Sequence, residues 1–233
     1  MTTTDSLERT LATGTEVSVH RVKRALAAGS LGGPIFVALV VIQMAIVPWF
    51  DIRRLPLSIL SIGETWYLQK AAFLLSGLLT IVGAIGLRRA IRGTPAGRFG
   101  PLLIGAFGAG LVLASVFNID ATDGAPPGVP SAAPGHYSWH MWAHNLSSML
   151  AFVCLSIACF VFVRRFARQR AIGWAVASAC VGASTLVLFF VPIGSASLRL
   201  AIASVVMFAW TSALFLTVRA TVSELPPAPG VAR

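Results

Sequence analysis

The sequence predicts an all-α membrane protein, a bundle of six transmembrane helices with both termini cytoplasmic. The first observation behind this is composition: 56% of the 233 residues are hydrophobic and only 11% are charged, whereas soluble domains carry about 25% charged residues. The second is length, because a bilayer core needs about 20 apolar residues per helix. Backbone groups cannot stay unpaired in lipid, so each spanning stretch is a helix. Six stretches are long enough, at residues 29–50, 66–87, 99–119, 140–163, 171–192 and 198–218.

The distribution of basic residues sets the orientation. The N-terminal tail, the 88–98 connection and the 164–170 connection hold four Lys or Arg residues each, and the C-terminal tail holds two, out of 18 in the chain. Basic residues are enriched on the cytoplasmic side of a membrane protein. We therefore expect both termini to be cytoplasmic in a multi-pass protein of the cell (plasma) membrane. The net charge of +10 is then a consequence of topology, and its short runs do not form the continuous basic face that binds nucleic acid.

The chain divides into three parts by composition. Residues 1–24 contain acids and no apolar core, so we expect a disordered cytoplasmic tail and not a secretory signal. Residues 25–220 are the expected six-helix transmembrane domain, and the proline-rich residues 221–233 a second disordered cytoplasmic tail. Glycines within the spans, such as Gly77 and Gly108, predict close approach of neighbouring helices.

The segment HYSWHMWAHN contains three of the four histidines of the chain, His136, His140 and His144. Residues four apart share a helix face, so these histidines define one face. Trp139 and Trp142 point elsewhere and are typical of the aromatic belt at the headgroup level. The histidine face therefore needs an explanation of its own.

An acid is expected at the same depth in the bilayer. His144 lies 20 residues before Arg164, about 30 Å along a helix, and Asp120 lies 22 residues after Arg98, about 33 Å. The third and fourth spans are expected to be antiparallel neighbours. Asp120 is therefore predicted at the level of His140 and His144, at the outer edge of the membrane.

Three interpretations of this cluster stay open. His140, His144 and Asp120 could bind a divalent metal ion, since two helical histidines four apart and one carboxylate suit such a site. The same three residues could form a metal-free acid/base pair or network with a catalytic role. The histidines could also simply donate hydrogen bonds to the backbone of the connection. Four further residues are assigned supporting roles: Asp123, His136, Glu64 and Ser58.

The first outer connection, DIRRLPLSILSIGETWYLQK, is the second segment of interest. Its apolar residues predict that it lies back onto the bundle and covers the site as a lid: Leu55, Leu57, Ile59, Leu60 and Ile62. No G-x-S-x-G motif is present, so Ser58 is not marked as a nucleophile.

Four short stretches resemble a bacterial integral membrane family catalogued as domain of unknown function 998. They are Ser58-Ile59-Leu60, Gly86-Leu87-Arg88-Arg89, Phe117-Asn118-Ile119-Asp120, and His144 followed by Ser147, Ser148, Ala151 and Phe152. Asn118 departs from the pattern, and His136 and His140 go beyond it. The resemblance covers roughly residues 30–220 and implies a six-helix fold, but it supplies no activity.

Two classes of function follow. The first is an outward-facing His/Asp site at the membrane surface that acts on a lipid-like or amphiphilic substrate reached from the bilayer. The alternative is a non-catalytic accessory subunit or a small-molecule carrier. The spans hold no interior acid or base, which is unlike a pump with a carboxylate relay. All the membrane histidines lie on one helix, which is unlike a haem-binding bundle.

Overall fold

The computed structural model describes residues 18–122, 124–133, 135–192 and 194–223. This part of the chain has six helices that are long and apolar enough to cross a membrane, the first running over Ser18–Ile46. The named elements are α2 (Gly32–Ile46), the 3₁₀ turn η1 (Leu57–Ser61), α3 (Trp66–Ala90), α4 (Phe99–Val116), α5 (Trp139–Arg168), α6 (Ile172–Phe190) and α7 (Ala196–Ser223).

The all-α six-helix architecture predicted from the sequence is confirmed. Within the described residues the first helix runs over Ser18–Ile46, so it includes residues 18–24 of the expected N-terminal tail. The rest of the N-terminal tail and the C-terminal residues 224–233 lie outside the described residues.

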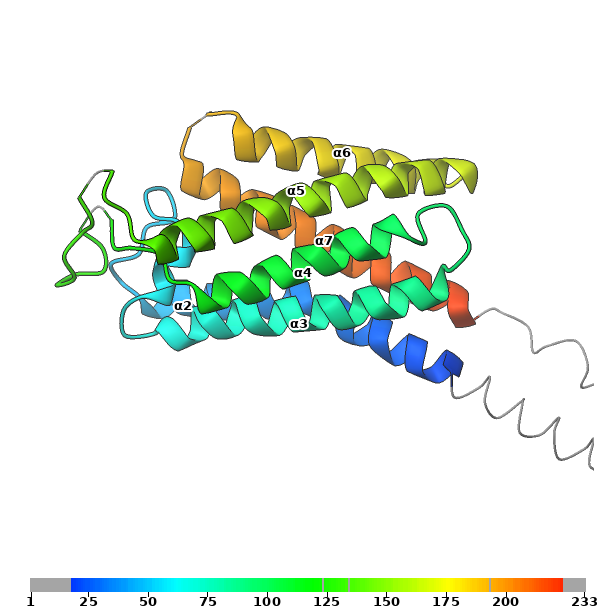
Figure 1. The fold of residues 1–233 in the computed structure, drawn as a ribbon, viewed down its shortest axis with the longest axis horizontal. Coiled ribbons are helices and arrows are strands. Elements are labelled where there is room, and N and C mark those ends of the chain that lie inside the picture. Colours follow the sequence, from blue (N-terminus) through cyan, green and yellow to red (C-terminus); the bar gives the residue numbers. More distant parts are fainter. Residues whose placement is uncertain (1–17, 123, 134, 193, 224–233) are drawn as a thin grey trace, which may run out of the picture.

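Helices that follow one another in the chain pack side by side, and α7 returns to contact α2 and α3 (Figure 1). An even number of spans puts Ser18 and Ser223 at one end of the bundle. We call this end, with the connections 91–98 and 169–171, the arginine end. The opposite end, with the connections 47–65, 117–138 and 191–195, is the histidine end.

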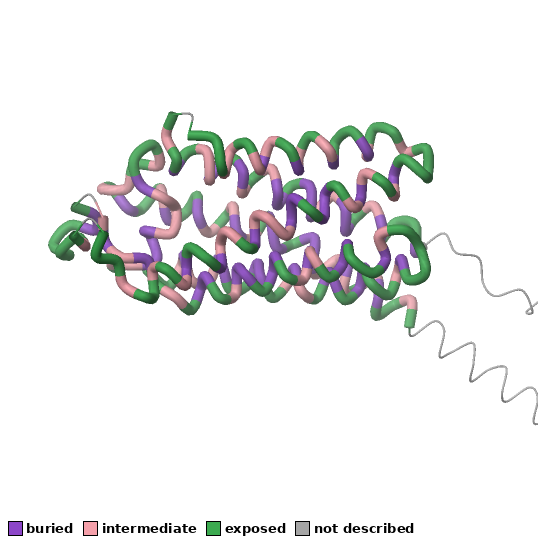
Figure 2. The backbone as a smooth tube through the Cα atoms, turned by 45° about the horizontal axis from the view of Figure 1, so that its top comes forward, coloured by how far each residue is buried: buried purple, intermediate pink, exposed green. Residues whose placement is uncertain are grey.

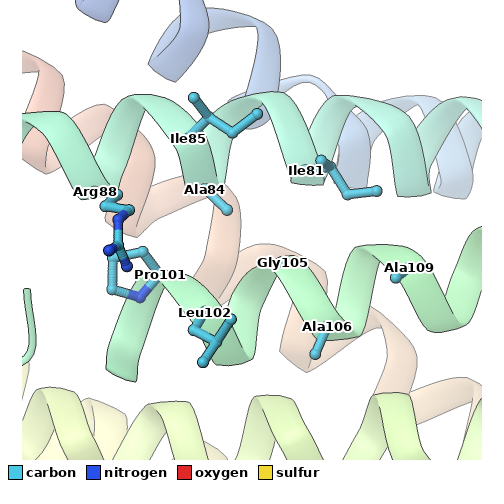
Figure 3. A pocket seen from close by; sticks show the side chains of 9 residues that line it. All are labelled: Ile81, Ala84, Ile85, Arg88, Pro101, Leu102, Gly105, Ala106 and Ala109. Carbon is cyan, nitrogen blue, oxygen red and sulfur yellow. The ribbon is translucent and has the colours of Figure 1, made fainter. Parts of the chain in front are cut away.

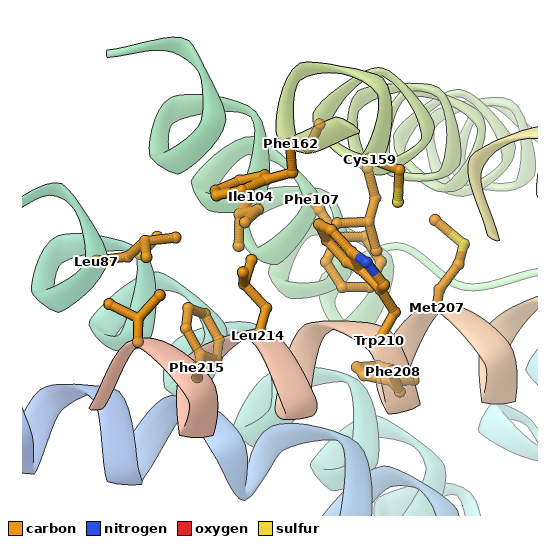
Figure 4. Packing of buried hydrophobic residues seen from close by; sticks show 14 of the residues in the cluster. Leu87, Ile104, Phe107, Cys159, Phe162, Met207, Phe208, Trp210, Leu214 and Phe215 are labelled. Atoms are coloured by element: carbon orange, nitrogen blue, oxygen red, sulfur yellow. The ribbon is translucent and has the colours of Figure 1, made fainter. Parts of the chain in front are cut away.

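The core is largely built on α7 and α5. Phe208, Trp210 and Phe215 project from α7 into the interior (Figure 4). The Phe162 ring on α5 lies edge-on to Trp210 at a centroid distance of 5.7 Å. In contrast, α6 is peripheral, and only four of its residues are buried: Ala175, Ser178, Gly182 and Thr185. Buried residues are concentrated toward the bundle axis (Figure 2). Many large apolar residues are exposed on the outside, as a lipid-facing surface requires.

Two glycine pairs set the spacing between helices. A Cβ atom on Gly77 would lie 2.6 Å from the carbonyl oxygen of Gly108, so α3 and α4 touch through their backbones there. A Cβ on Gly83 would lie 2.8 Å from Cα of Gly29. The close approach predicted from the glycines is therefore observed.

The first connection at the histidine end folds back onto the bundle, as its apolar residues predict. Leu55, Ile59 and Leu60 are buried. Gln43 of α2, itself fully buried, fixes the segment: its Nε2 donates to the carbonyl oxygens of Leu60 (3.0 Å) and Thr65 (2.7 Å). The connection is therefore a packed cover over this end of the bundle.

Candidate functional site at the histidine end

His144 lies two turns into α5 and is buried, with 3% of its surface exposed. Its Nδ1 lies 3.1 Å from the carbonyl oxygen of Ala114 and 3.0 Å from that of Phe117. Ala114 lies in the last turn of α4 and Phe117 is its C-cap residue, where the end of a helix leaves carbonyls without backbone partners. His144 therefore closes the α4–α5 hairpin by satisfying the end of α4.

The two carbonyls also fix the tautomer of His144. A carbonyl oxygen only accepts hydrogen bonds, so Nδ1 must carry the hydrogen that it donates. In the neutral imidazole, Nε2 then presents a lone pair. Within the described residues Nε2 forms no hydrogen bond, and the ring meets Phe73 edge-on at 5.9 Å. One nitrogen of His144 is used by the fold, and the other can still accept a hydrogen bond.

His144 lines a cavity of about 290 Å³ beneath the folded-back connection. The cavity is bordered by helices α2, α3, α5, α6 and α7, by η1 and by Ile119. Its polar groups lie on η1, α5 and α7: Ser58, His144, Asn145, Ser148 and Ser204. Its main apolar groups are Phe36, Phe73, Phe152, Phe189 and Leu200.

The chemistry of this cavity follows from its lining. No Asp or Glu lines it, so the described residues do not assemble a Ser-His-Asp arrangement there. A neutral imidazole among serine hydroxyls and an amide can accept a hydrogen bond or take up one proton. Asn145 is exposed while His144 is buried, so the cavity leads from the bundle surface inward.

Asp120 is engaged at the start of α5. Its Oδ1 accepts a hydrogen bond from the Ser138 hydroxyl and its Oδ2 one from the Ser138 backbone N–H, both at 2.6 Å. The same hydroxyl accepts from the N–H of Met141 and so caps α5. Asp120 and Ser138 form a clamp that joins the two ends of the long 117–138 connection.

His140 lies on the surface and does not share the cavity of His144. Its ring stacks on Trp139 at a centroid distance of 3.8 Å. His140 and Asp120 line the same surface hollow of about 470 Å³, so the structure brings these two predicted residues to one place. It separates them from His144, whose side chain faces the other cavity and the end of α4.

The supporting residues are dispersed. Ser58 borders the cavity of His144, and Glu64 is exposed in a separate hollow beside Trp66 and Pro126. His136 is exposed in the connection. Asp123 lies outside the described residues.

The described side chains do not form a ready-made metal site. Among the residues with described positions, no three His, Cys, Asp or Glu side chains are grouped so that they could hold one metal ion. Asp120 already accepts two hydrogen bonds, and Nδ1 of His144 is a donor. Binding of a divalent ion by His140, His144 and Asp120 stays a prediction.

The sequence analysis missed several polar residues of the cavity. Asn145 and Ser204 were not singled out, although each is a polar residue within an otherwise apolar span, which is an indication of function in a membrane protein. The same signal marks Gln69 on α3, which is fully buried and whose amide oxygen and nitrogen have no partner in the described structure.

Comparison with known proteins identifies one family. The family model described as protein of unknown function (DUF998) matches residues 30–222. No curated protein and no solved structure matches the chain.

Proposed function

The chain belongs to the DUF998 family of proteins, and we propose that it binds a lipid-like or amphiphilic small molecule in the His144 cavity. The observation that supports the proposal is that the two ring nitrogens of His144 have different roles. Its Nδ1–H holds two carbonyls of α4, which leaves Nε2 as an acceptor for a hydroxyl or ammonium group of the ligand.

The lining of the cavity supports an amphiphile. Serine hydroxyls and the Asn145 amide sit beside His144 to meet a polar group, while phenylalanine rings offer an apolar wall. A volume of about 290 Å³ is at the lower end of the range for small-molecule sites, about 300–1,000 Å³. This suits a headgroup with the first part of an apolar chain.

We also propose that the histidine end faces the outside of the cell membrane and that both termini are cytoplasmic. The basic residues of the 88–98 and 164–170 connections lie at the opposite end of the bundle, and such residues are retained in the cytoplasm. The ligand would then come from the outer leaflet.

The proposal is one of binding, which a carrier or an accessory subunit would share. A catalytic role at the surface hollow, with His140 and Asp120 as acid and base, is the second candidate. It is favoured by their shared hollow, and it requires that Asp120 release Ser138.

Two isosteric variants test the binding proposal. Asn places its amide nitrogen where Nδ1 of histidine lies, and Gln places its amide where Nε2 lies. The probe is a monoacylglycerol with a photoreactive diazirine in its chain, added to the full-length protein in nanodiscs, with crosslinks mapped by mass spectrometry. We expect labelling of the cavity-lining stretches of α5 and α7.

The variants should separate the two nitrogens of His144. His144→Asn keeps the donor to α4 and should reduce labelling about fivefold, the effect of one hydrogen bond of about 1 kcal/mol. His144→Gln should retain labelling and lose stability. Ser204→Leu, which fills the cavity, should abolish labelling. Labelling that is spread evenly over the lipid-facing helices and unchanged in Ser204→Leu would refute the proposal.

A further inference from the structure

The arginine end carries a groove between α4 and α5 that is independent of the His144 cavity. The groove has a volume of about 580 Å³ and is bordered by the 94–98 connection, the first turn of α4 and the last three turns of α5. Three of its residues are arginines: Arg98, Arg164 and Arg168. Figure 1 shows α4 and α5 side by side along this stretch.

The three arginines form a cluster of positive charge without acidic partners. Arg164 and Arg168 are four residues apart on α5 and share a face, while Arg98 stands opposite, directly before α4. Within the described structure none of the three pairs with a carboxylate, and the recorded contact of Arg98 is with the ring of Phe99 at 5.4 Å. Three unneutralised guanidinium groups around one groove favour an anion.

A fourth arginine builds the groove without contributing its charge to it. Arg165 Nη1 donates to Thr94 Oγ1 at 2.5 Å, which ties the connection between α3 and α4 to α5.

The rest of the groove is apolar and extends toward the middle of the bundle. Phe99, Ile157 and Phe160 line it, and each exposes more than 40% of its surface. Ile157 lies seven residues before Arg164, about 10 Å along the helix. The groove thus combines a cationic rim with an apolar strip along the membrane-facing surface.

We propose that this groove binds one anionic phospholipid. The phosphate lies among Arg98, Arg164 and Arg168, and an acyl chain lies along Phe99, Ile157 and Phe160. Charge complementarity selects the headgroup, because basic pockets between transmembrane helices bind anionic headgroups. The apolar strip distinguishes a lipid from a free phosphate ion, which would leave that surface uncovered.

The neighbouring groove between α3 and α4 provides a contrast. It measures about 380 Å³ and has a single arginine, Arg88, beside Pro101 at one end, while its other residues are apolar (Figure 3). It could accept an acyl chain, but it lacks the arginine cluster. Selectivity for an anionic headgroup is therefore expected only between α4 and α5.

The experiment measures headgroup selectivity on the purified full-length protein. Native mass spectrometry counts bound lipid during titration with dioleoylphosphatidylglycerol or with dioleoylphosphatidylcholine. We expect the wild type to bind the anionic lipid at least about tenfold more tightly, given a gain of about 1 kcal/mol per basic residue. Arg98→Gln/Arg164→Gln/Arg168→Gln should reduce this preference to about twofold or less. Arg165 is left intact because it holds the connection in place.

A matched control removes the same charge from the same end. Arg21, Arg89 and Arg92 are exposed and do not line the groove, so their triple replacement by Gln should keep the preference. An equal loss in both triple variants, or equal binding of the two lipids by the wild type, would overturn the proposal. Displacement of the lipid by equimolar inorganic phosphate would also overturn it, because the groove would then be a phosphate site. If the triple variant does not fold, the lipid preference of the wild type and its response to phosphate still test the proposal.

Discussion

At the histidine end, the α4–α5 and α6–α7 hairpins use different side chains to hydrogen-bond the carbonyls at the end of their first helix. In both, the first helix ends with carbonyls that lack backbone partners, and a basic residue early in the second helix supplies the donor. His144 donates to Ala114 and Phe117. Arg199 donates to Leu188 at 2.8 Å and to Val191. Carbonyl groups at membrane depth require such partners, because lipid offers no hydrogen-bond donor.

The difference between the two caps is instructive. Arginine is always charged and has only donors, so Arg199 can do little besides hold the end of α6. Histidine needs one nitrogen for the cap and keeps a second that can accept a proton or a hydrogen bond. His144 lines the 290 Å³ cavity, whereas Arg199 is not among the residues that line it. A histidine at this position can therefore cap the helix and still offer the acceptor that the proposed binding function needs.

The largest effect is expected for His144→Leu. The carbonyls of Ala114 and Phe117 lose their donor, and groups left unpaired cost about 1–3 kcal/mol each, so the free energy of unfolding should fall by about 2–6 kcal/mol. SDS titration followed by circular dichroism measures the change. His144→Asn serves as the control and should recover most of the loss. Equal destabilisation by Leu and Asn would contradict the proposed cap.

A smaller effect is expected for Asp120→Asn, which weakens the Asp120–Ser138 clamp of the α4–α5 hairpin. The amide can accept one of the two hydrogen bonds from Ser138, so about 1 kcal/mol of stability should be lost. Limited proteolysis should cut the 121–137 connection faster, while the core stays protected. Unchanged cleavage would show that the clamp does not hold this connection. Loss of diazirine labelling in this variant would favour the surface hollow over the His144 cavity.

The smallest effect is expected for Arg199→Lys, which keeps the charge and one donor. The free energy of unfolding should change by less than about 1 kcal/mol. Labelling of the His144 cavity by the diazirine monoacylglycerol should equal that of the wild type. A fall in labelling as large as in His144→Asn would mean that the two caps affect the cavity alike, and would contradict a ligand contact specific to His144.

The sequence was sufficient to predict the membrane-spanning helices, because each helix is indicated by a continuous apolar stretch of the chain. Apolar runs of 18 or more residues bounded by arginines leave few alternatives, and the described helices follow them closely. The folding back of the first connection was also predictable from Leu55, Ile59 and Leu60. Depth arguments placed Asp120, His140 and His144 at one end of the bundle, where they are found.

The grouping of the site residues was harder to predict. Depth fixes a residue along the membrane normal but does not fix the rotation of its helix. His140 and His144 are separated by one turn and by about 40°, and this was enough to place one on the surface and the other against Ala114. The pairing of Asp120 with Ser138 depends on the path of an irregular connection, which periodicity does not describe.

The sequence alone determined the class of this protein, its six helices and the end of the bundle that carries the arginines, because hydrophobicity and charge act residue by residue along the chain. Only the tertiary structure decided which nitrogen of His144 is free, which serines join it and which three arginines share a groove. These properties arise from contacts between helices far apart in the chain, and their geometry is set by packing around residues such as Gly77 and Gly108.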